Sequence, residues 1–206
     1  MTGILTNFSG RDALLWGHQP LKVTHDLGDQ ALFSRAALAR LIETYPREHY
    51  GLIAMGGTGD SKLWQEGDLG GASGEAVLDA IEKGRLWLNL RNVSGVNPAH
   101  GLLLDTIFSE LRQRLPGFDA TKWQSGILIS SPGAQVYYHA DLPNQLLWQI
   151  AGRKRLWLYP ASPPFITDRD LEDIALFDVE VDTPYQDWYD EHARVMVPGF
   201  FAWAAR

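Results

Sequence analysis

The sequence predicts a β-rich α+β fold in which helices from the first half of the chain pack on the outside of an antiparallel β sandwich or barrel. Helical periodicity is confined to the first 116 residues, and after Phe118 the chain consists of short segments rich in β-branched and aromatic residues. No repeat or linker divides the two parts. We therefore expect one domain over residues 1–206, with a helical and mixed part over 1–118 and the β core over 119–206.

Three amphipathic helices are predicted in the first part of the chain. They cover residues 34–45, about 74–83 and about 98–115. Each has apolar residues at helical spacing and a recognisable end, because Pro46, Gly84 and Pro116 stop the three helices in turn. Ser34 is placed to cap the first helix with its hydroxyl group.

Nine short segments have the composition of β-strands. They are residues 21–24, 50–55, 86–90, 126–130, 135–139, 145–150, 155–159, 176–181 and 194–197. The third shows a clear alternation, with Leu86, Leu88 and Leu90 against Trp87 and Asn89. The last six are separated by turn residues at a spacing typical of an antiparallel sandwich or barrel.

Composition excludes several classes of function. The chain has 18 basic and 25 acidic residues, a net charge of −7, so it offers no uniformly basic surface to nucleic acid. It has no cysteine, which excludes disulfides, zinc fingers and thiol nucleophiles, so any metal must be held by histidine and carboxylate. No stretch approaches the roughly 18 apolar residues of a membrane span, and we expect a cytoplasmic protein without a membrane partner.

The segment from Tyr137 to Gln145 carries the candidate metal ligands. On a strand, residues i and i+2 point to one face, so His139 and Asp141 can direct an imidazole and a carboxylate at one point. These are two of the three ligands of the facial triad that holds non-haem Fe(II). Tyr137 would share their face, for contact with substrate or cosubstrate or for core packing, while Tyr138 would pack outward. Alone, His-x-Asp is a weak motif, and a histidine satisfied by its structural neighbours is the alternative.

The residues that follow give this motif a specific context. The segment from Ser130 to Pro160 resembles the jumonji-C type of the cupin-like, iron- and 2-oxoglutarate-dependent dioxygenases. In that family a His-x-Asp pair precedes a Gln-Ile-x-Gly-x-Lys-Arg hairpin that leads to a Tyr-Pro or Phe-Pro corner. The matching residues here are His139, Asp141, Gln149, Ile150, Gly152, Lys154, Arg155, Tyr159 and Pro160.

The resemblance implies a function for Lys154, because the matching lysine of the family binds the distal carboxylate of 2-oxoglutarate as a point charge on a flexible stem. The alternative is a solvated hairpin lysine. The resemblance also implies that the β core is a double-stranded β-helix, the jelly roll of cupin-like proteins. The protein would then be an oxygenase that binds Fe(II) through His139 and Asp141, uses 2-oxoglutarate as cosubstrate, and hydroxylates or demethylates a substrate.

The substrate cannot be read from the sequence, although family members act on side chains of proteins or peptides. Two other functions stay open. One is a non-catalytic cupin-like binding module that has lost its metal, and the other is a metal-dependent cupin enzyme that does not use 2-oxoglutarate.

The family's third metal ligand, a second histidine beyond a Pro-Gly turn, does not follow Pro198-Gly199 here. We therefore expect either a longer polypeptide with this ligand beyond Arg206 or a degenerate family member that has lost iron. His192, before the turn, is a weak substitute. The apolar residues 200–205 would form an unpaired strand edge of an incomplete jelly roll, which a homodimer would cover.

An acidic stretch runs from the loop before the predicted strand 176–181 into that strand. Its members are Asp168, Asp170, Glu172, Asp173, Asp178, Glu180 and Asp182. We expect a solvated loop and strand face, with attraction of a basic peptide substrate as the functional alternative.

Overall fold

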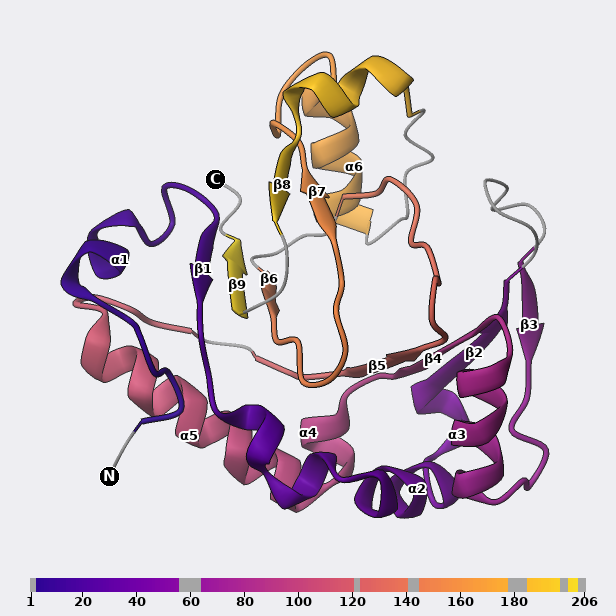
Figure 1. The fold of residues 1–206 in the computed structure, drawn as a ribbon. Coiled ribbons are helices and arrows are strands. Elements are labelled where there is room, and N and C mark those ends of the chain that lie inside the picture. The colour runs from indigo at the N-terminus through magenta and orange to yellow at the C-terminus, as the bar shows by residue number, and fades with distance from the viewer. Residues whose placement is uncertain are drawn as a thin grey trace. The chain divides into compact units, whose positions relative to one another are not determined.

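The computed structural model of the chain describes residues 3–55, 64–120, 123–140, 145–177, 185–196 and 200–203. The protein has an α+β fold, as the sequence predicts (Figure 1). Its internal contacts define two compact units. Unit 1 comprises Met1–Gly28, Arg114–Pro116 and Tyr138–Arg206, and unit 2 comprises Asp29–Gln113 and Gly117–Tyr137. Whether the two units make one domain stays a prediction.

Unit 2 is built on an antiparallel sheet of four strands. In spatial order these are β3 (Gln65–Gly67), β2 (Tyr50–Ala54), β4 (Leu86–Leu90) and β5 (Ile127–Ser130). In this register Leu88 of β4 lies between Leu52 of β2 and Ile129 of β5. Strands β2, β4 and β5 are predicted to within one residue at each end. The short β3 was not expected, since its residues carry no apolar alternation.

Two helices, α2 (Arg35–Glu43) and α3 (Gly74–Lys83), lie on one face of this sheet (Figure 1). Both are confirmed predictions. Ser34 and Ser73 cap them, because each hydroxyl oxygen accepts a hydrogen bond from the backbone N–H three residues further on. Gly84 ends α3, where its N–H donates to the carbonyl oxygen of Ala80.

The core of unit 2 lies between these helices and the sheet. Leu88 and Leu90 of β4 are both 0% exposed. The other buried members of this core are Ala39, Leu41, Ile42, Tyr45, Tyr50, Val77, Leu78, Ile81 and Val93. Because burial of one aliphatic side chain stabilises a fold by about 1.5–3 kcal/mol, this aliphatic layer is the main source of stability in unit 2.

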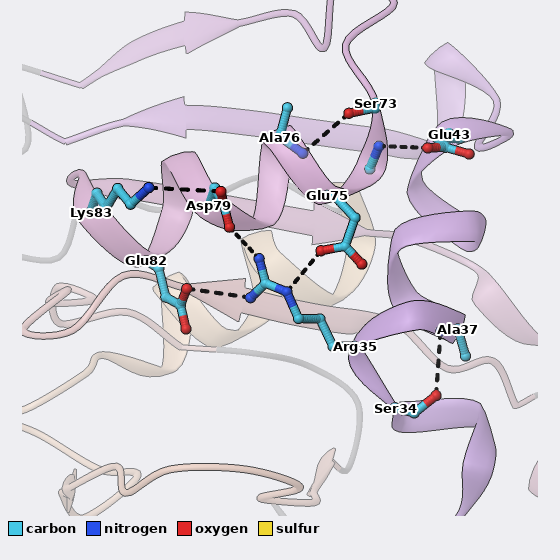
Figure 2. A network of polar contacts seen from close by, with 11 residues as sticks. Ser34, Arg35, Ala37, Glu43, Ser73, Glu75, Ala76, Asp79, Glu82 and Lys83 are labelled. Atoms are coloured by element: carbon cyan, nitrogen blue, oxygen red, sulfur yellow. Dashed lines mark hydrogen bonds and ion pairs between the residues drawn. The ribbon is translucent and has the colours of Figure 1, made fainter.

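Polar contacts join α2 to α3 on their solvent side (Figure 2). The guanidinium of Arg35 pairs with three carboxylates of α3, and its Nε lies 2.8 Å from Oε2 of Glu75. The other two carboxylates are those of Asp79 and Glu82. All four side chains are at least 43% exposed, so solvent and salt weaken these ion pairs.

The two helices approach most closely at Gly74. A Cβ atom at this position would collide with the backbone carbonyl oxygen of Ala39, so only glycine fits. The N–H of Gly74 donates to Oε1 of Glu43 over 2.9 Å, which satisfies an N–H at the start of α3.

The remaining helices of unit 2 connect β4 to β5. Helix α4 (Val93–Val96) leads into the long α5 (Pro98–Arg114), the third predicted helix. The Oδ1 atom of Asn97 accepts a hydrogen bond from the N–H of Ala99 and so caps α5. Single 3₁₀ turns occur at Leu27–Asp29, Ala31–Phe33 and Arg47–His49.

Unit 1 contains two small antiparallel sheets. One has the order β1 (Leu21–Val23), β9 (Phe200–Trp203), β6 (Gln145–Leu147), and the other pairs β7 (Leu156–Leu158) with β8 (Arg194–Met196). We expected the segments at β6 and β7 to form a hairpin, and this is wrong. They belong to different sheets, because each pairs with a strand about 40 to 60 residues further along the chain.

The predicted unpaired edge at residues 200–205 is also wrong for the residues that the structure describes there. Strand β9 is the central strand of its sheet, with β1 on one side and β6 on the other. A homodimer therefore stays a prediction, but without this strand edge as its physical reason.

Two helices of unit 1 were not predicted. Helix α1 (Gly10–Leu15) starts with a capping box formed by Ser9 and Asp12. Helix α6 (Asp168–Phe177) starts with the reciprocal bonds of Thr167 and Asp170. The expectation that helices occur only before residue 117 is therefore wrong. The expected loop at the first acidic residues is also wrong, because Asp168, Asp170, Glu172 and Asp173 belong to α6.

The strand predicted at residues 176–181 is wrong for its first two residues, which end α6. The remaining four lie outside the described residues. The Thr-x-x-Asp box before Leu171 and Ile174 is a local helix signal, but the high acidic content of the stretch obscured it. The described part of unit 1 also includes a 3₁₀ helix, η5 (Asp187–His192).

Candidate functional site

Lys154 is the predicted site residue that the structure characterises best. It lies in unit 1 between Gly152, which makes a turn with a φ of 73°, and β7. Its side chain is partly buried, whereas its neighbours Arg153 and Arg155 are exposed. Burial lowers the pKa of the Lys154 ammonium group below the ordinary value for lysine, because desolvation disfavours the charged form.

Lys154 makes no ion pair within the described part of the chain. No carboxylate among those residues lies within ion-pair distance of its ammonium group. A partly desolvated cation without a counter-ion is costly in a folded protein. A carboxylate beside the ammonium group would offset this cost.

His139 lies in unit 1 but not on a strand. The strand expected at residues 135–139 is wrong, because this segment has irregular structure and pairs with no strand of the described chain. The imidazole of His139 is exposed, and Asp141 lies outside the described residues. Within the described ranges no three His, Asp or Glu side chains form a group that could hold a metal ion. Because Asp141 is outside that search, His139 and Asp141 stay predicted ligands.

The two tyrosines before His139 belong to different units. Tyr137 belongs to unit 2, where its ring centroid lies 5.2 Å from that of Trp64. Tyr138 belongs to unit 1 and is half-buried rather than packed outward, with its hydroxyl donating to the carbonyl oxygen of Phe165 over 2.7 Å. Burial raises the pKa of Tyr138 to about 12. A cosubstrate contact by Tyr137 stays a prediction.

An aromatic cluster, which sequence reasoning missed, surrounds Tyr189 in unit 1. The ring centroid of Tyr189 lies 4.7 Å from that of Trp188, 4.9 Å from that of Phe165 and 5.6 Å from that of Tyr138. The cluster also includes Tyr159, Tyr185 and His192. The aromatic residues from 185 to 192 were a visible signal, but the members at 138, 159 and 165 join them only through tertiary contacts.

Hydrogen bonds fix the hydroxyl groups of this cluster. The hydroxyl of Tyr189 donates to the carbonyl oxygen of Pro164 over 2.9 Å, and that of Tyr159 donates to Oδ1 of Asp190 over 2.6 Å. Burial and the Asp190 carboxylate raise the pKa of Tyr159 above that of an ordinary tyrosine. The cluster is thus an oriented structure and not a loose apolar contact.

His192, the weak candidate for a third metal ligand, is exposed at the rim of this cluster. Its ring packs edge-on against Trp188 and Phe165, with centroid distances of 5.7 and 5.6 Å. Aromatic packing accounts for its position, and its role as a ligand stays a prediction.

Two open hollows occur in unit 2. The larger, of about 320 Å³, is lined by residues that include Tyr45, Arg47, Tyr50, Asp68 and Gly70. Its polar groups already bind one another, since Asp68 accepts from Arg47, from the hydroxyl of Tyr50 and from the N–H of Gly70. The smaller, of about 250 Å³, is lined in part by Asn92, Asp105 and Trp123. Neither contains a predicted site residue.

Comparison with protein-family models, curated proteins and solved structures finds no match to this chain. Among the helices in the described part of the chain, none is long and apolar enough to span a bilayer.

Proposed function

We propose that this chain is a cupin-like protein of the jumonji-C type that binds 2-oxoglutarate through Lys154 and, when it holds Fe(II), oxidises a substrate. The observation that carries the proposal is the partly buried ammonium group of Lys154, for which the described residues supply no carboxylate. The resemblance of residues 130–160 to the family supplies the identity of the anion.

The chemistry of Lys154 suits a dicarboxylate. A carboxylate beside the ammonium group replaces the solvation that burial removes, and a charge-assisted contact of this kind is worth about 1.5–3 kcal/mol. Because burial lowers the pKa of Lys154, its cationic form is lost at a lower pH than that of a free lysine. We expect 2-oxoglutarate to bind below the pKa of Lys154 and to dissociate as the pH rises through it.

The strand pairing of unit 1 supports the jelly-roll part of the proposal. In a jelly roll, a long antiparallel hairpin is folded so that successive strands contribute to two sheets. The β6–β9 and β7–β8 pairs are nested in this way, and consecutive strands β6 and β7 lie in different sheets. The described strands do not close a barrel, so the jelly roll remains part of the proposal.

Iron is the second component of the proposed site. Bound Fe(II) would allow O2 to act as the oxidant, which takes two electrons from 2-oxoglutarate, released as succinate and CO2, and two from a substrate C–H bond. His139 and Asp141 would hold it, and His139 belongs to the same unit as Lys154. The second candidate is a non-catalytic binding module that retains the Lys154 site and holds no metal.

Titration calorimetry with 2-oxoglutarate tests the Lys154 site. Lys154→Ala should weaken binding by roughly 10- to 100-fold, because the charge-assisted contact is lost. Arg153→Ala removes an exposed cation one residue away and should leave the affinity unchanged. Absence of binding to the wild type, or equal affinities of wild type and Lys154→Ala, would reject the site.

Anaerobic addition of Fe(II) and 2-oxoglutarate separates the oxygenase from the binding module. The oxygenase should show the weak visible charge-transfer band of a chelated cosubstrate, and His139→Ala should abolish it. Binding of 2-oxoglutarate without this band, at saturating iron, would favour the module.

A further inference from the structure

The segment from Tyr185 to His192 presents a second surface that could bind a partner. A 3₁₀ helix has three residues per turn, so side chains three positions apart lie above one another. Trp188 and Glu191 have this spacing within η5, and Tyr185 precedes them at the same spacing. Tyr185 and Trp188 are each 42% exposed, and Glu191 is exposed as well. We call these three residues the 185–191 stripe.

The ring of Trp188 is held in a fixed orientation even though much of it faces solvent. It stands at 90° to the ring of Tyr189 and at 89° to that of His192, with a further contact to Phe165. Tyr185 likewise packs edge-on against Tyr189. A ligand that stacks on these rings therefore has little side-chain freedom to remove, which lowers the entropic cost of binding.

The segment that forms the stripe is acidic. Residues 185–192 contain Asp187, Asp190 and Glu191 and neither lysine nor arginine. Asp187 and Glu191, on either side of Trp188, are exposed, and no basic side chain of the described residues lies within ion-pair distance of them. Such a field attracts cations and repels nucleic acid and anionic lipid surfaces.

We propose that the 185–191 stripe binds a cationic peptide segment of another protein. The side chain of an arginine or lysine would lie over the rings of Trp188 and Tyr185, with its charged end beside Glu191 and Asp187. The aromatic faces and the uncompensated carboxylates are complementary to the same ligand, because both attract a cation. The proposal requires neither Lys154 nor a metal, so it stands or falls apart from the proposed function.

Unit 1 itself offers a matched comparison for the stripe. Trp157 of β7 is 43% exposed, almost the same fraction as Trp188. The guanidinium carbon of Arg155, however, lies 5.8 Å from the centroid of the Trp157 ring, so a cation of the chain already occupies that ring. Glu172, on α6, is an exposed acidic residue outside the segment 185–192. Substitutions at these two positions control for exposed apolar area and for negative charge.

Fluorescence anisotropy with a short dye-labelled peptide of alternating arginine and glycine tests the proposal at low salt and at about 0.15 M salt, where the Debye length is about 8 Å. Trp188→Ala and Glu191→Gln should each weaken binding by about 2- to 5-fold, the range for one exposed cation–π contact or ion pair. Trp157→Ala and Glu172→Gln should bind as the wild type does, and a glutamate–glycine peptide should not bind.

Two results would overturn the proposal. One is wild-type affinity in the Trp188→Ala, Glu191→Gln double variant, and the other is an equal loss in the two control variants, which would reveal general attraction to an acidic protein. Glu191→Gln changes one exposed side chain without changing its size, so it tests the proposal even if Trp188→Ala disturbs the aromatic cluster.

Discussion

Different kinds of internal contact stabilise unit 2 and unit 1. Unit 2 buries aliphatic side chains between two capped helices and a sheet of four strands. Unit 1 has strands of three or four residues in two separate sheets, together with an aromatic cluster whose hydroxyl groups bind backbone and carboxylate oxygens. The stabilisation from aliphatic burial depends on the apolar area removed from water, whereas that from the aromatic cluster also depends on the direction of its hydrogen bonds. Variants of one unit should therefore fail in a different way from variants of the other.

The largest effect should come from a cavity in unit 2. Leu88→Ala removes a fully buried side chain at the centre of the sheet and should lower the free energy of unfolding by about 2–5 kcal/mol. Leu128→Ala, on the neighbouring strand, removes a side chain that is 44% exposed and should cost much less. Denaturant unfolding measures both. If the two variants lost similar amounts of unfolding free energy, the buried Leu88 would be no more important for stability than the exposed Leu128.

Each unit contains one histidine whose pKa is lowered by burial. His100 in unit 2 is 6% exposed, and neither ring nitrogen has a hydrogen-bond partner among the described residues. Burial lowers its pKa below the ordinary 6.5, so its neutral form stabilises the folded state above that pH and the contribution is lost as the pH falls. The slope reaches at most about 1.4 kcal/mol per pH unit for one proton. His100→Leu should flatten the dependence of unfolding free energy on pH below 6.5, while the exposed His18→Gln should keep it.

His25 provides the corresponding test in unit 1. Its pKa is lowered by burial against Trp148, and its Nδ1 accepts a hydrogen bond from the N–H of Leu27 over 3.1 Å. Amide hydrogen exchange of the wild-type protein at pH values below 6.5 would show which unit opens first in acid.

A smaller effect is expected from the hydroxyl groups of the aromatic cluster. Tyr189→Phe keeps the ring and removes the donor to the carbonyl oxygen of Pro164, so it should cost about 0.5–1.5 kcal/mol. Near-ultraviolet circular dichroism, which reports on the packing of aromatic rings, should change less than in Tyr189→Ala. If Tyr189→Phe left the unfolding free energy unchanged, buried apolar area alone would stabilise the cluster. The two units would then not differ in the kind of contact that stabilises them.

The smallest effect should follow substitution of Arg35 (Figure 2). Its three ion pairs with α3 are exposed, and the carboxylates raise the pKa of a guanidinium that is already charged. Arg35→Gln should lower the thermal midpoint slightly at low salt and by less at high salt. A large loss that does not depend on salt would show that packing between α2 and α3, and not charge, requires this side chain.

The predicted site illustrates the limit of sequence reasoning. The pattern from His139 to Pro160 identified Lys154 as a candidate, but its burial and the absence of a carboxylate near it among the described residues are tertiary properties. The inference that His139 and Asp141 share one face depended on a strand that does not form at residues 135–139. The aromatic cluster escaped prediction because its members come from four separate segments.

By itself, the sequence determined the elements whose signals lie within one or two turns of chain. Helices α2 and α3 follow from a serine cap, an apolar face and a stop signal, and strand β4 follows from strict alternation, all of which are local. The nested pairing of β6 with β9 and of β7 with β8, the central place of β9 and the burial of Lys154 were decided only by tertiary structure. A strand of three residues has too few side chains to specify a partner, so its pairing depends on which distant segment supplies the complementary hydrogen bonds and apolar face.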